Sequence, residues 1–153
     1  MTNEELKNKI ISVFPEAEYT EEGTQYLNVI SNPDKFRSLA EFLRNNDEMS
    51  FDFLFCLTGV DWVTNLMVIY HLESTKNKHT IVLKVKITDR ENPAVETVSD
   101  IWRTAEFHER EVFDLFGVKF INHPDLRRLL LEDDWIGYPL RKDYKDEANI
   151  VEL

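Results

Sequence analysis

Residues 51–88 restrict the fold of this chain more than any other part, because their polarity repeats with the two-residue period of a β-strand. One predicted face of the first segment carries large apolar side chains: Phe51, Phe53, Phe55 and Leu57. Gly59 is expected to mark a bulge or the end of that strand. Residues 65–73 are apolar on both faces, which indicates a central strand, and residues 79–88 alternate cleanly. The polar residues 74–78 form a loop short enough to make the last two strands antiparallel neighbours.

Two helices and a hairpin are expected before this stretch. Thr2 and Glu5 have the spacing of a capping box, and Pro15 ends the helix that follows. Residues 16–20 and 24–30 predict two short strands joined by a turn at 21–23. A second helix is expected to begin at Asn32-Pro33-Asp34, where a capping side chain precedes a proline, and to end at Asn45-Asn46.

A third helix is expected after a break at Asn92-Pro93. It runs from about Thr104 to Phe116, and Gly117 is its left-handed cap. The predicted order is therefore helix, two strands, helix, three strands, an α+β fold with helices packed on a mainly antiparallel sheet. Residues 118–153 show little periodicity, so we divide the chain into an α+β domain at 1–117 and an extended C-terminal arm at 118–153.

Length and charge exclude several classes of protein. A chain of 153 residues fits one domain, and its formal net charge of −11 argues against binding nucleic acid, which requires clustered Lys and Arg. A single cysteine, Cys56, rules out a disulfide framework and a cysteine-held iron–sulfur cluster within this chain. We expect no membrane-spanning segment and no signal peptide in residues 1–14, and therefore a soluble domain of a reducing compartment.

Four carboxylates on the third predicted helix raise the question of acid–base catalysis: Glu106, Glu109, Glu111 and Asp114. The favoured interpretation is structural. Arg110 lies four residues after Glu106 and four before Asp114, which is the spacing of ion pairs along a helix surface.

Other candidates for chemistry are weak. His108 with Glu111, or His123 with Asp125, could ligate a metal, but the zinc-protease pattern His-Glu-x-x-His is absent. His123-Pro124-Asp125 fits the start of a helix equally well, and that interpretation is favoured. Cys56 is expected to be a small buried hydrophobe rather than a nucleophile. We therefore predict no catalytic, cofactor-binding or metal-binding residue from this pattern.

The C-terminal third combines paired cations with aromatic side chains. Arg127, Arg128, Arg141 and Lys142 share this segment with Trp135, Tyr138 and Tyr144. Arginine and exposed aromatics are typical anchors of protein interfaces. We expect the three arginines to pair with carboxylates of a partner and Trp135 to fill an apolar pocket on it. By contrast, Phe53 is expected to lie in the core, where truncation to alanine would cost about 3–5 kcal/mol.

Three runs within residues 109–144 resemble a known signature. Residues 109–117 read Glu-Arg-Glu-Val-Phe-Asp-Leu-Phe-Gly, and residues 123–130 read His-Pro-Asp-Leu-Arg-Arg-Leu-Leu. Residues 134–144 read Asp-Trp-Ile-Gly-Tyr-Pro-Leu-Arg-Lys-Asp-Tyr. Together they closely resemble the C subunit of respiratory complex I, which is the 30 kDa subunit of NADH:quinone oxidoreductase. The resemblance carries over a set of signature and partner-interface residues: Glu109, Arg110, Glu111, Asp114, Gly117, His123, Pro124, Arg127, Arg128, Trp135, Gly137, Pro139, Arg141, Lys142, Asp143 and Tyr144.

The resemblance implies a non-catalytic role in a larger enzyme. In that family the protein belongs to the peripheral arm, on the cytoplasmic face of the cell (inner) membrane, and is attached to the membrane only through the complex. It packs beside the 49 kDa-type D subunit and the small iron–sulfur B and I subunits. FMN, the iron–sulfur clusters and quinone are carried by those and other partners, so no cofactor is expected in this chain. Its role would be to support assembly of the quinone-reducing module, and thereby proton-translocating electron transfer from NADH to quinone.

Two alternatives remain open. The same signature occurs in subunits of related membrane-bound hydrogenases and of deazaflavin- or ferredoxin-dependent complexes, so the chain could be the equivalent subunit of one of them. A different class of function, a stand-alone soluble hydrolase using the carboxylates of residues 106–114, would require turnover by the isolated chain.

Overall fold

The computed structural model describes residues 1–20 and 25–145. The predicted hairpin turn at 21–23 and residues 146–153 of the predicted arm lie outside the described residues. No helix within the described part of the chain is long and apolar enough to cross a membrane.

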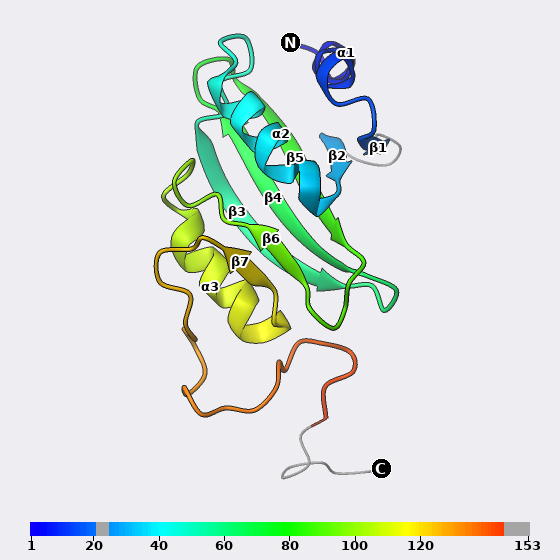
Figure 1. Ribbon diagram of the computed structural model, residues 1–153. Helices are drawn as coiled ribbons and strands as arrows, with labels where there is room; N and C mark the ends of the chain where they lie inside the picture. The colour runs from blue at the N-terminus through cyan, green and yellow to red at the C-terminus, as the bar shows by residue number, and fades with distance from the viewer. Residues whose placement is uncertain (21–24, 146–153) are drawn as a thin grey trace.

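In the described part of the chain, three helices pack with a five-stranded sheet and a second sheet of two short strands (Figure 1). The elements in chain order are α1 (Asn3–Val13), β1 (Glu18–Thr20), β2 (Leu27–Ser31), α2 (Pro33–Asn45), β3 (Phe53–Asp61), β4 (Leu66–Ser74), β5 (His79–Ile87), β6 (Ala94–Glu96), α3 (Ala105–Phe116) and β7 (Lys119–Ile121). The larger sheet has the strand order β1-β2-β5-β4-β3. Every neighbouring pair in it is antiparallel except β2 with β5. The predicted α+β class and mainly antiparallel sheet are confirmed.

Local capping signals account for the helix boundaries. Thr2 and Glu5 form the predicted capping box, because each side chain accepts from the other residue's backbone N–H. Asn32 accepts from the N–H of Lys35 at the start of α2. At the end of α3, Gly117 has a φ of 77° and donates its N–H to the carbonyl of Phe113.

The core lies between the helices and one face of the larger sheet. Alternate residues of β4 and β5 are buried there: Leu66, Val68, Tyr70 and Leu72 of β4, with Ile81, Leu83, Val85 and Ile87 of β5. Aligned pairs such as Tyr70 with Leu83 point to the same side. The alternation predicted for β5 is confirmed.

A β-bulge changes the alternation predicted for β3. The register with β4 shifts between Leu54 and Cys56, so the buried residues are Leu54 and Leu57. Phe53 and Phe55 are 44% and 42% exposed, respectively. The prediction that Phe53 is a core residue was wrong, because one extra residue reverses the face on which preceding residues lie. Gly59 does not form the bulge and lies inside the strand.

The start of the predicted arm belongs to the packed domain. Lys119–Ile121 forms β7, which pairs in parallel with β6, and Val118 and Phe120 are buried in the core. The expected helix at His123-Pro124-Asp125 does not form. Asn122 instead has a φ of 66°, and the chain continues through turns. The backbone N–H groups of residues 129–131 donate to the Asp114 carboxylate instead of to carbonyls one helical turn earlier.

Candidate functional site

The signature carboxylates of α3 do not form the predicted ion pairs along the helix surface. Glu109 and Asp114 are fully buried, and Arg110 is 7% exposed. Arg110 donates to the backbone carbonyls of Arg127 (3.1 Å) and Arg128 (3.0 Å). The charged groups of α3 therefore contact the C-terminal segment and the loop before α3.

Asp114 binds three consecutive backbone N–H groups. Its Oδ2 accepts from Leu129, Leu130 and Leu131 at 3.2, 2.7 and 3.0 Å, respectively. Its Oδ1 accepts from Arg128 at 2.9 Å. Burial by itself raises the pKa of Asp114, but these hydrogen bonds together outweigh it, so the pKa lies below its usual value. The ionised carboxylate thus holds an irregular stretch of backbone that no sheet or helix supports.

Arg128 connects α3 with residues further along the segment. Its Nη1 donates to the backbone oxygen and Oδ1 of Asp114, and its Nη2 donates to the carbonyls of Trp135 and Gly137, all at 2.9 Å. Its guanidinium also lies 5.1 Å from the ring centre of Tyr138. The side chain is only 11% exposed. Arg128 is therefore occupied within its own chain, which removes the reason for expecting it to bind a partner's carboxylate.

Glu109 fixes the loop that precedes α3. It accepts from the Thr97 hydroxyl at 2.5 Å and the Val98 N–H at 2.8 Å. Burial raises its pKa to about 7, although both hydrogen bonds oppose the shift. His123 lies 3.7 Å away and directs Nε2 to the Glu106 carbonyl, while its Nδ1 accepts from the Asp125 N–H. His123 thus connects the end of β7 to the backbone of α3.

A third buried carboxylate, Asp61 at the end of β3, holds the far end of the C-terminal segment. Arg90 contacts both of its oxygens, at 2.6 and 3.0 Å, and the Lys142 N–H donates to it at 2.8 Å. The hydrogen bonds from Arg90 are the main cause that holds the pKa of Asp61 well below its usual range. Arg141 donates to the Arg90 carbonyl and to Asp143. Arg141, like Arg128, has intramolecular partners.

Comparison with known proteins identifies the family of this chain. Residues 29–149 match the family described as the 30 kDa subunit of respiratory-chain NADH dehydrogenase. The chain belongs to this family. The resemblance predicted from the three signature runs is confirmed.

Curated relatives of this 30 kDa subunit family include fused and separate forms. The C/D subunit of NADH-quinone oxidoreductase from Phocaeicola vulgatus is 53% identical over 114 residues, covering 74% of this chain and 22% of that protein. The C subunit of the same enzyme from Chloroherpeton thalassium is 43% identical over 118 residues, covering 76% and 49%, respectively. The chain thus spans from about a fifth to about half of the length of these relatives.

Solved structures share the fold. A chain from the membrane-bound sulfane sulfur reductase, an archaeal respiratory membrane complex, superimposes with a TM-score of 0.78 at 29% identity. The match covers 95% of this chain and 86% of that chain. A trypsin-resistant fragment of Nqo5 gives a TM-score of 0.68 at 29% identity, covering 80% and 98%, respectively.

The two signature glycines allow aromatic rings to lie directly on the backbone. A Cβ added to Gly117 would lie 2.6 Å from the ring of Tyr138, and one added to Gly137 would lie 2.9 Å from the ring of Tyr144. Both glycines have positive φ, at 77° and 88°. Pro139 lies half-buried next to Tyr138. These family residues are explained by the path of the backbone rather than by chemistry on a substrate.

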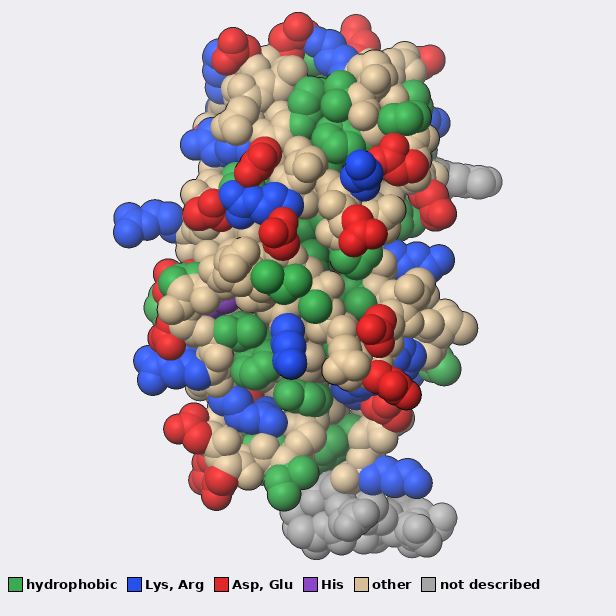
Figure 2. All heavy atoms as spheres, in the orientation of Figure 1, with side chains coloured by type: hydrophobic (Ala, Val, Ile, Leu, Met, Phe, Trp, Pro, Cys, Tyr) green, Lys and Arg blue, Asp and Glu red, His purple; other side chains and the backbone are tan. Residues whose placement is uncertain are grey.

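The remaining signature side chains define an outer surface. We call residues 122–144 the clamped arm, because Asp114 and Asp61 hold it at two points. Large apolar side chains of the clamped arm are exposed: Leu129 (38%), Leu130 (63%), Trp135 (37%), Ile136 (90%) and Leu140 (53%). Arg127 is exposed and paired with Asp125. Figure 2 shows apolar side chains between charged groups on the lower part of this side of the molecule, where Figure 1 places α3 and the arm.

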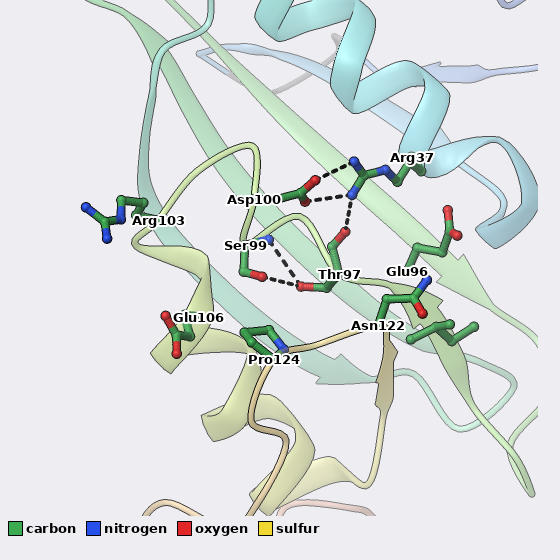
Figure 3. A pocket seen from close by; sticks show the side chains of 10 residues that line it. Arg37, Glu96, Thr97, Ser99, Asp100, Arg103, Glu106, Asn122 and Pro124 are labelled. Carbon is green, nitrogen blue, oxygen red and sulfur yellow. Dashed lines mark hydrogen bonds and ion pairs between the residues drawn. The ribbon is translucent and has the colours of Figure 1, made fainter.

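An open hollow of about 560 Å³ lies beside the buried Glu109, between α2, the loop before α3 and the start of the clamped arm (Figure 3). Arg37 crosses it with two bonds to Asp100, at 2.7 and 2.6 Å, and one to the Thr97 carbonyl. Pro124 lines the opposite side. Arg37 is engaged by these bonds, whereas four other polar side chains that line the hollow form no hydrogen bond or ion pair with the described residues: Glu96, Arg103, Glu106 and Asn122.

Other candidate chemistry finds no geometric support. Glu109 and Asp114 are both fully buried and hydrogen-bonded, so neither can contact a substrate as a catalytic pair. Among the described residues no three His, Cys, Asp or Glu side chains lie together as metal ligands would. Glu111 and His108 are half-buried on α3. Cys56 is also half-buried, not enclosed in the core as expected.

Sequence reasoning missed three residues of the buried polar clusters. Thr97, Asp61 and Arg90 complete the buried clusters, but none lies in the signature runs. The only available signal was an aspartate, Asp61, at the end of an otherwise apolar strand, where an unpaired carboxylate would be costly.

Proposed function

We propose that this chain is a cofactor-free, non-catalytic subunit of a complex I type NADH:quinone oxidoreductase. In this proposal it supports assembly of the quinone-reducing module in the peripheral arm, on the cytoplasmic face of the membrane. The observation that carries it is the clamped arm. Buried charges hold an irregular segment so that Leu130 and Ile136 point to solvent, 63% and 90% exposed. Apolar side chains held rigidly outward are what a permanent partner would cover.

The proposed partners are the 49 kDa-type D subunit and the small iron–sulfur B and I subunits. Support for the 49 kDa-type partner comes from relatives whose name joins C and D in one chain, such as the one in Bacteroides thetaiotaomicron, 50% identical over 120 residues. Fusion keeps two domains at high effective concentration, which suits proteins that bind each other.

FMN, iron–sulfur clusters and quinone are assigned to partner subunits. Cys56 is the only cysteine, so this chain cannot supply the thiolates that a cluster requires. The purified chain is expected to be colourless, and iron analysis together with a visible spectrum would test this. One cluster per chain would contradict the proposal.

The assembly role is tested by removing the exposed apolar side chains of the clamped arm. A tagged Leu130→Ser, Ile136→Ser variant is expected to recover much less of the D, B and I partners from detergent-solubilised membranes of its host. Membranes should lose NADH:quinone activity while the flavin subunit still reduces an artificial acceptor, because electrons can still enter.

The matched control changes two exposed apolar residues of α1, at the opposite end of the molecule (Figure 1). Ile11→Ser with Val13→Ser alters side chains that are 37% and 51% exposed, and should leave recovery and activity unchanged. Wild-type recovery and activity in the arm variant would disprove the assembly role of the arm.

A second candidate function is the equivalent subunit of another membrane-bound redox complex. The structural match to the sulfane sulfur reductase complex favours it, because that chain aligns with 95% of this one. Related hydrogenases and deazaflavin- or ferredoxin-dependent complexes belong to the same alternative. The co-purifying proteins distinguish the two: an NADH-oxidising flavoprotein supports the first proposal, and a nickel–iron large subunit with hydrogenase activity supports the second.

A further inference from the structure

The two least exposed cations of the clamped arm already have partners within the chain. Arg128 donates to the Asp114 carboxylate and to three backbone carbonyls, and its side chain is 11% exposed. Arg141 binds Asp143 at 3.1 Å and the Arg90 carbonyl at 2.8 Å, and its side chain is 13% exposed. Neither guanidinium is therefore free to bind a carboxylate of another protein.

The other two cations of the arm add little positive charge to its outer surface. Arg127 is exposed, but its Nε lies 3.0 Å from Oδ2 of Asp125, so the two side chains together carry no net charge. Lys142 is exposed near the end of the arm, where its backbone N–H is held by Asp61. Lys142 is thus the one lysine or arginine of residues 122–144, all of which the structure describes, that has no carboxylate partner.

Three consecutive carboxylates of the arm also have no partner. The side chains of Glu132, Asp133 and Asp134 are exposed and form no hydrogen bond or ion pair with any residue that the structure describes. They directly precede Trp135 and Ile136, which are 37% and 90% exposed, respectively. We call these five residues the acidic loop. Three unpaired negative charges and two large apolar side chains therefore share one short surface segment.

The backbone of the acidic loop is fixed from within the chain. Nη2 of Arg128 donates to the carbonyls of Trp135 and Gly137, both at 2.9 Å. The Trp135 N–H donates to the Glu132 carbonyl at 3.0 Å. A segment that is already ordered loses little conformational freedom when a second protein binds it. The loop is therefore suited to act as a preformed contact.

The helix that supports the arm supplies no cation for the acidic loop. Arg110 of α3 donates to two backbone carbonyls of the arm. The side chains of Glu106 and Glu111 on the same helix form no ion pair within the described part of the chain, and they are acidic as well. The charges of the loop must therefore be balanced by water and dissolved ions, or by another protein.

A partner that covers the arm cannot leave these carboxylates unpaired. Asp134 lies two residues before Ile136, so a protein that buries the Ile136 side chain also removes water from the carboxylates beside it. An ionised carboxylate is costly to desolvate unless a cation pairs with it. A membrane surface does not provide that cation, because its anionic headgroups repel carboxylates. The required partner is a protein surface with lysine or arginine side chains.

We propose that the acidic loop binds a basic site on the subunit that covers the clamped arm, where Lys or Arg side chains surround an apolar pocket for Ile136. The inference rests on the proposed function, which supplies the partner but not the sign of its charge. That sign is opposite to the one expected from the sequence, because the structure uses Arg128 and Arg141 inside the chain. A negative patch that meets a positive one also selects the correct partner and speeds its association.

Neutralising the acidic loop in the full-length tagged chain, expressed in its host, tests this proposal. Glu132→Gln, Asp133→Asn and Asp134→Asn together keep the side chains nearly the same size and remove three charges. The measured quantity is the rate at which co-purifying subunits dissociate from the immobilised chain in detergent. This rate should rise at least about tenfold, because each lost ion pair weakens binding about twofold.

A charge-preserving variant separates charge from shape. Glu132→Asp, Asp133→Glu and Asp134→Glu change the length of each side chain and keep all three negative charges. The dissociation rate of this variant should stay within about twofold of the wild-type rate. Urea midpoints of the purified variants show that each chain remains folded.

A second control removes three charges elsewhere. Glu4→Gln, Glu16→Gln and Asp47→Asn alter exposed carboxylates that lie outside the arm and α3. The dissociation rate should equal that of the wild type, because these side chains are not part of the proposed contact.

Three results would overturn the inference. The neutralised variant could dissociate at the wild-type rate, or more slowly, which would indicate an acidic partner surface. The charge-preserving variant could also dissociate as fast as the neutralised one, which would indicate shape rather than charge. The Leu130→Ser, Ile136→Ser variant tests the proposed function separately. Loss of partners in that variant, with wild-type behaviour of the neutralised loop, would keep the arm interface and reject its basic partner site.

Discussion

Asp114→Asn is the sharpest test of how the clamped arm is held. The substitution keeps the shape of the side chain and replaces one carboxylate oxygen by an NH2 group. In the structure Oδ2 accepts three backbone N–H bonds, the shortest from Leu130 at 2.7 Å, and Oδ1 accepts from Arg128 at 2.9 Å. Whichever way the amide turns, its NH2 group faces donors instead of acceptors.

The expected loss of unfolding free energy follows from the burial of the Asp114–Arg128 ion pair. Removing one charge of a buried ion pair costs about 3–5 kcal/mol, because the other charge is left uncompensated. Asn retains one acceptor oxygen, and Arg128 retains the carbonyls of Trp135 and Gly137. We therefore expect the lower limit, about 3 kcal/mol of unfolding free energy at pH 7, which is roughly a hundredfold in the unfolding equilibrium.

Urea unfolding of the purified chain measures this loss, with Glu111→Gln as the matched control. Glu111 is half-buried on the same helix and has no hydrogen bond among the described residues, so its change should cost less than about 0.5 kcal/mol. The folded pKa of Asp114 lies below the unfolded value of 3.8, so its contribution is present above pH 3.8 and is lost as the pH falls through the folded pKa. The difference between wild type and Asp114→Asn should shrink accordingly in acid. A loss at pH 7 no larger than that of Glu111→Gln would refute the reasoning.

Three further predictions concern other positions. Glu109 binds a proton more tightly when folded, with a pKa of about 7 against 4.5, so the unfolding free energy should fall by about 3 kcal/mol as the pH rises from 4.5 to 7. Urea titrations across this range should show that Glu109→Gln removes this decline; an unchanged pH dependence would contradict it. Gly117→Ala should destabilise by about 1–3 kcal/mol, since Gly117 has positive φ and the added Cβ meets Tyr138; a thermal melt equal to wild type would exclude this. Phe53→Ala should cost less than about 1 kcal/mol in urea, whereas Phe36→Ala, fully buried on α2, should cost about 3–5 kcal/mol, and equal losses would show that Phe53 is a core residue after all.

Features set by nearest neighbours were predictable from the sequence. The caps at Thr2, Asn32 and Gly117 depend on residues within one helical turn, and each forms as predicted. The alternation of β5 was equally clear because its buried face repeats without interruption over 79–87. The two strands β6 and β7 were not predicted, since three residues cannot display a period.

The strand β3 was predicted from the sequence, but which of its side chains face the core was not. A bulge adds one residue to one strand and changes which side chains face the core. Nothing in Leu54-Phe55-Cys56 marks that extra residue, because all three are apolar and suit either face. The bulge or strand end was predicted at Gly59, but this glycine instead allows the ring of Phe116 to approach the strand.

At the candidate site, the hydrogen-bond partners of the buried charged side chains could not be predicted from the sequence. The family was identified correctly from the signature runs, but Arg110, Arg128 and Asp114 were assigned partners by helical spacing or by an assumed second protein. In the structure most of their partners are backbone carbonyl and N–H groups of residues 127–131 and 135–137. Every residue supplies such groups, so the sequence carries no mark of which ones are used. An arm without periodic structure must satisfy its backbone polar groups by other means, and buried side-chain charges are the remaining donors and acceptors. The irregular segment and the charged helix before it therefore depend on each other, because each supplies hydrogen-bonding partners that the other needs.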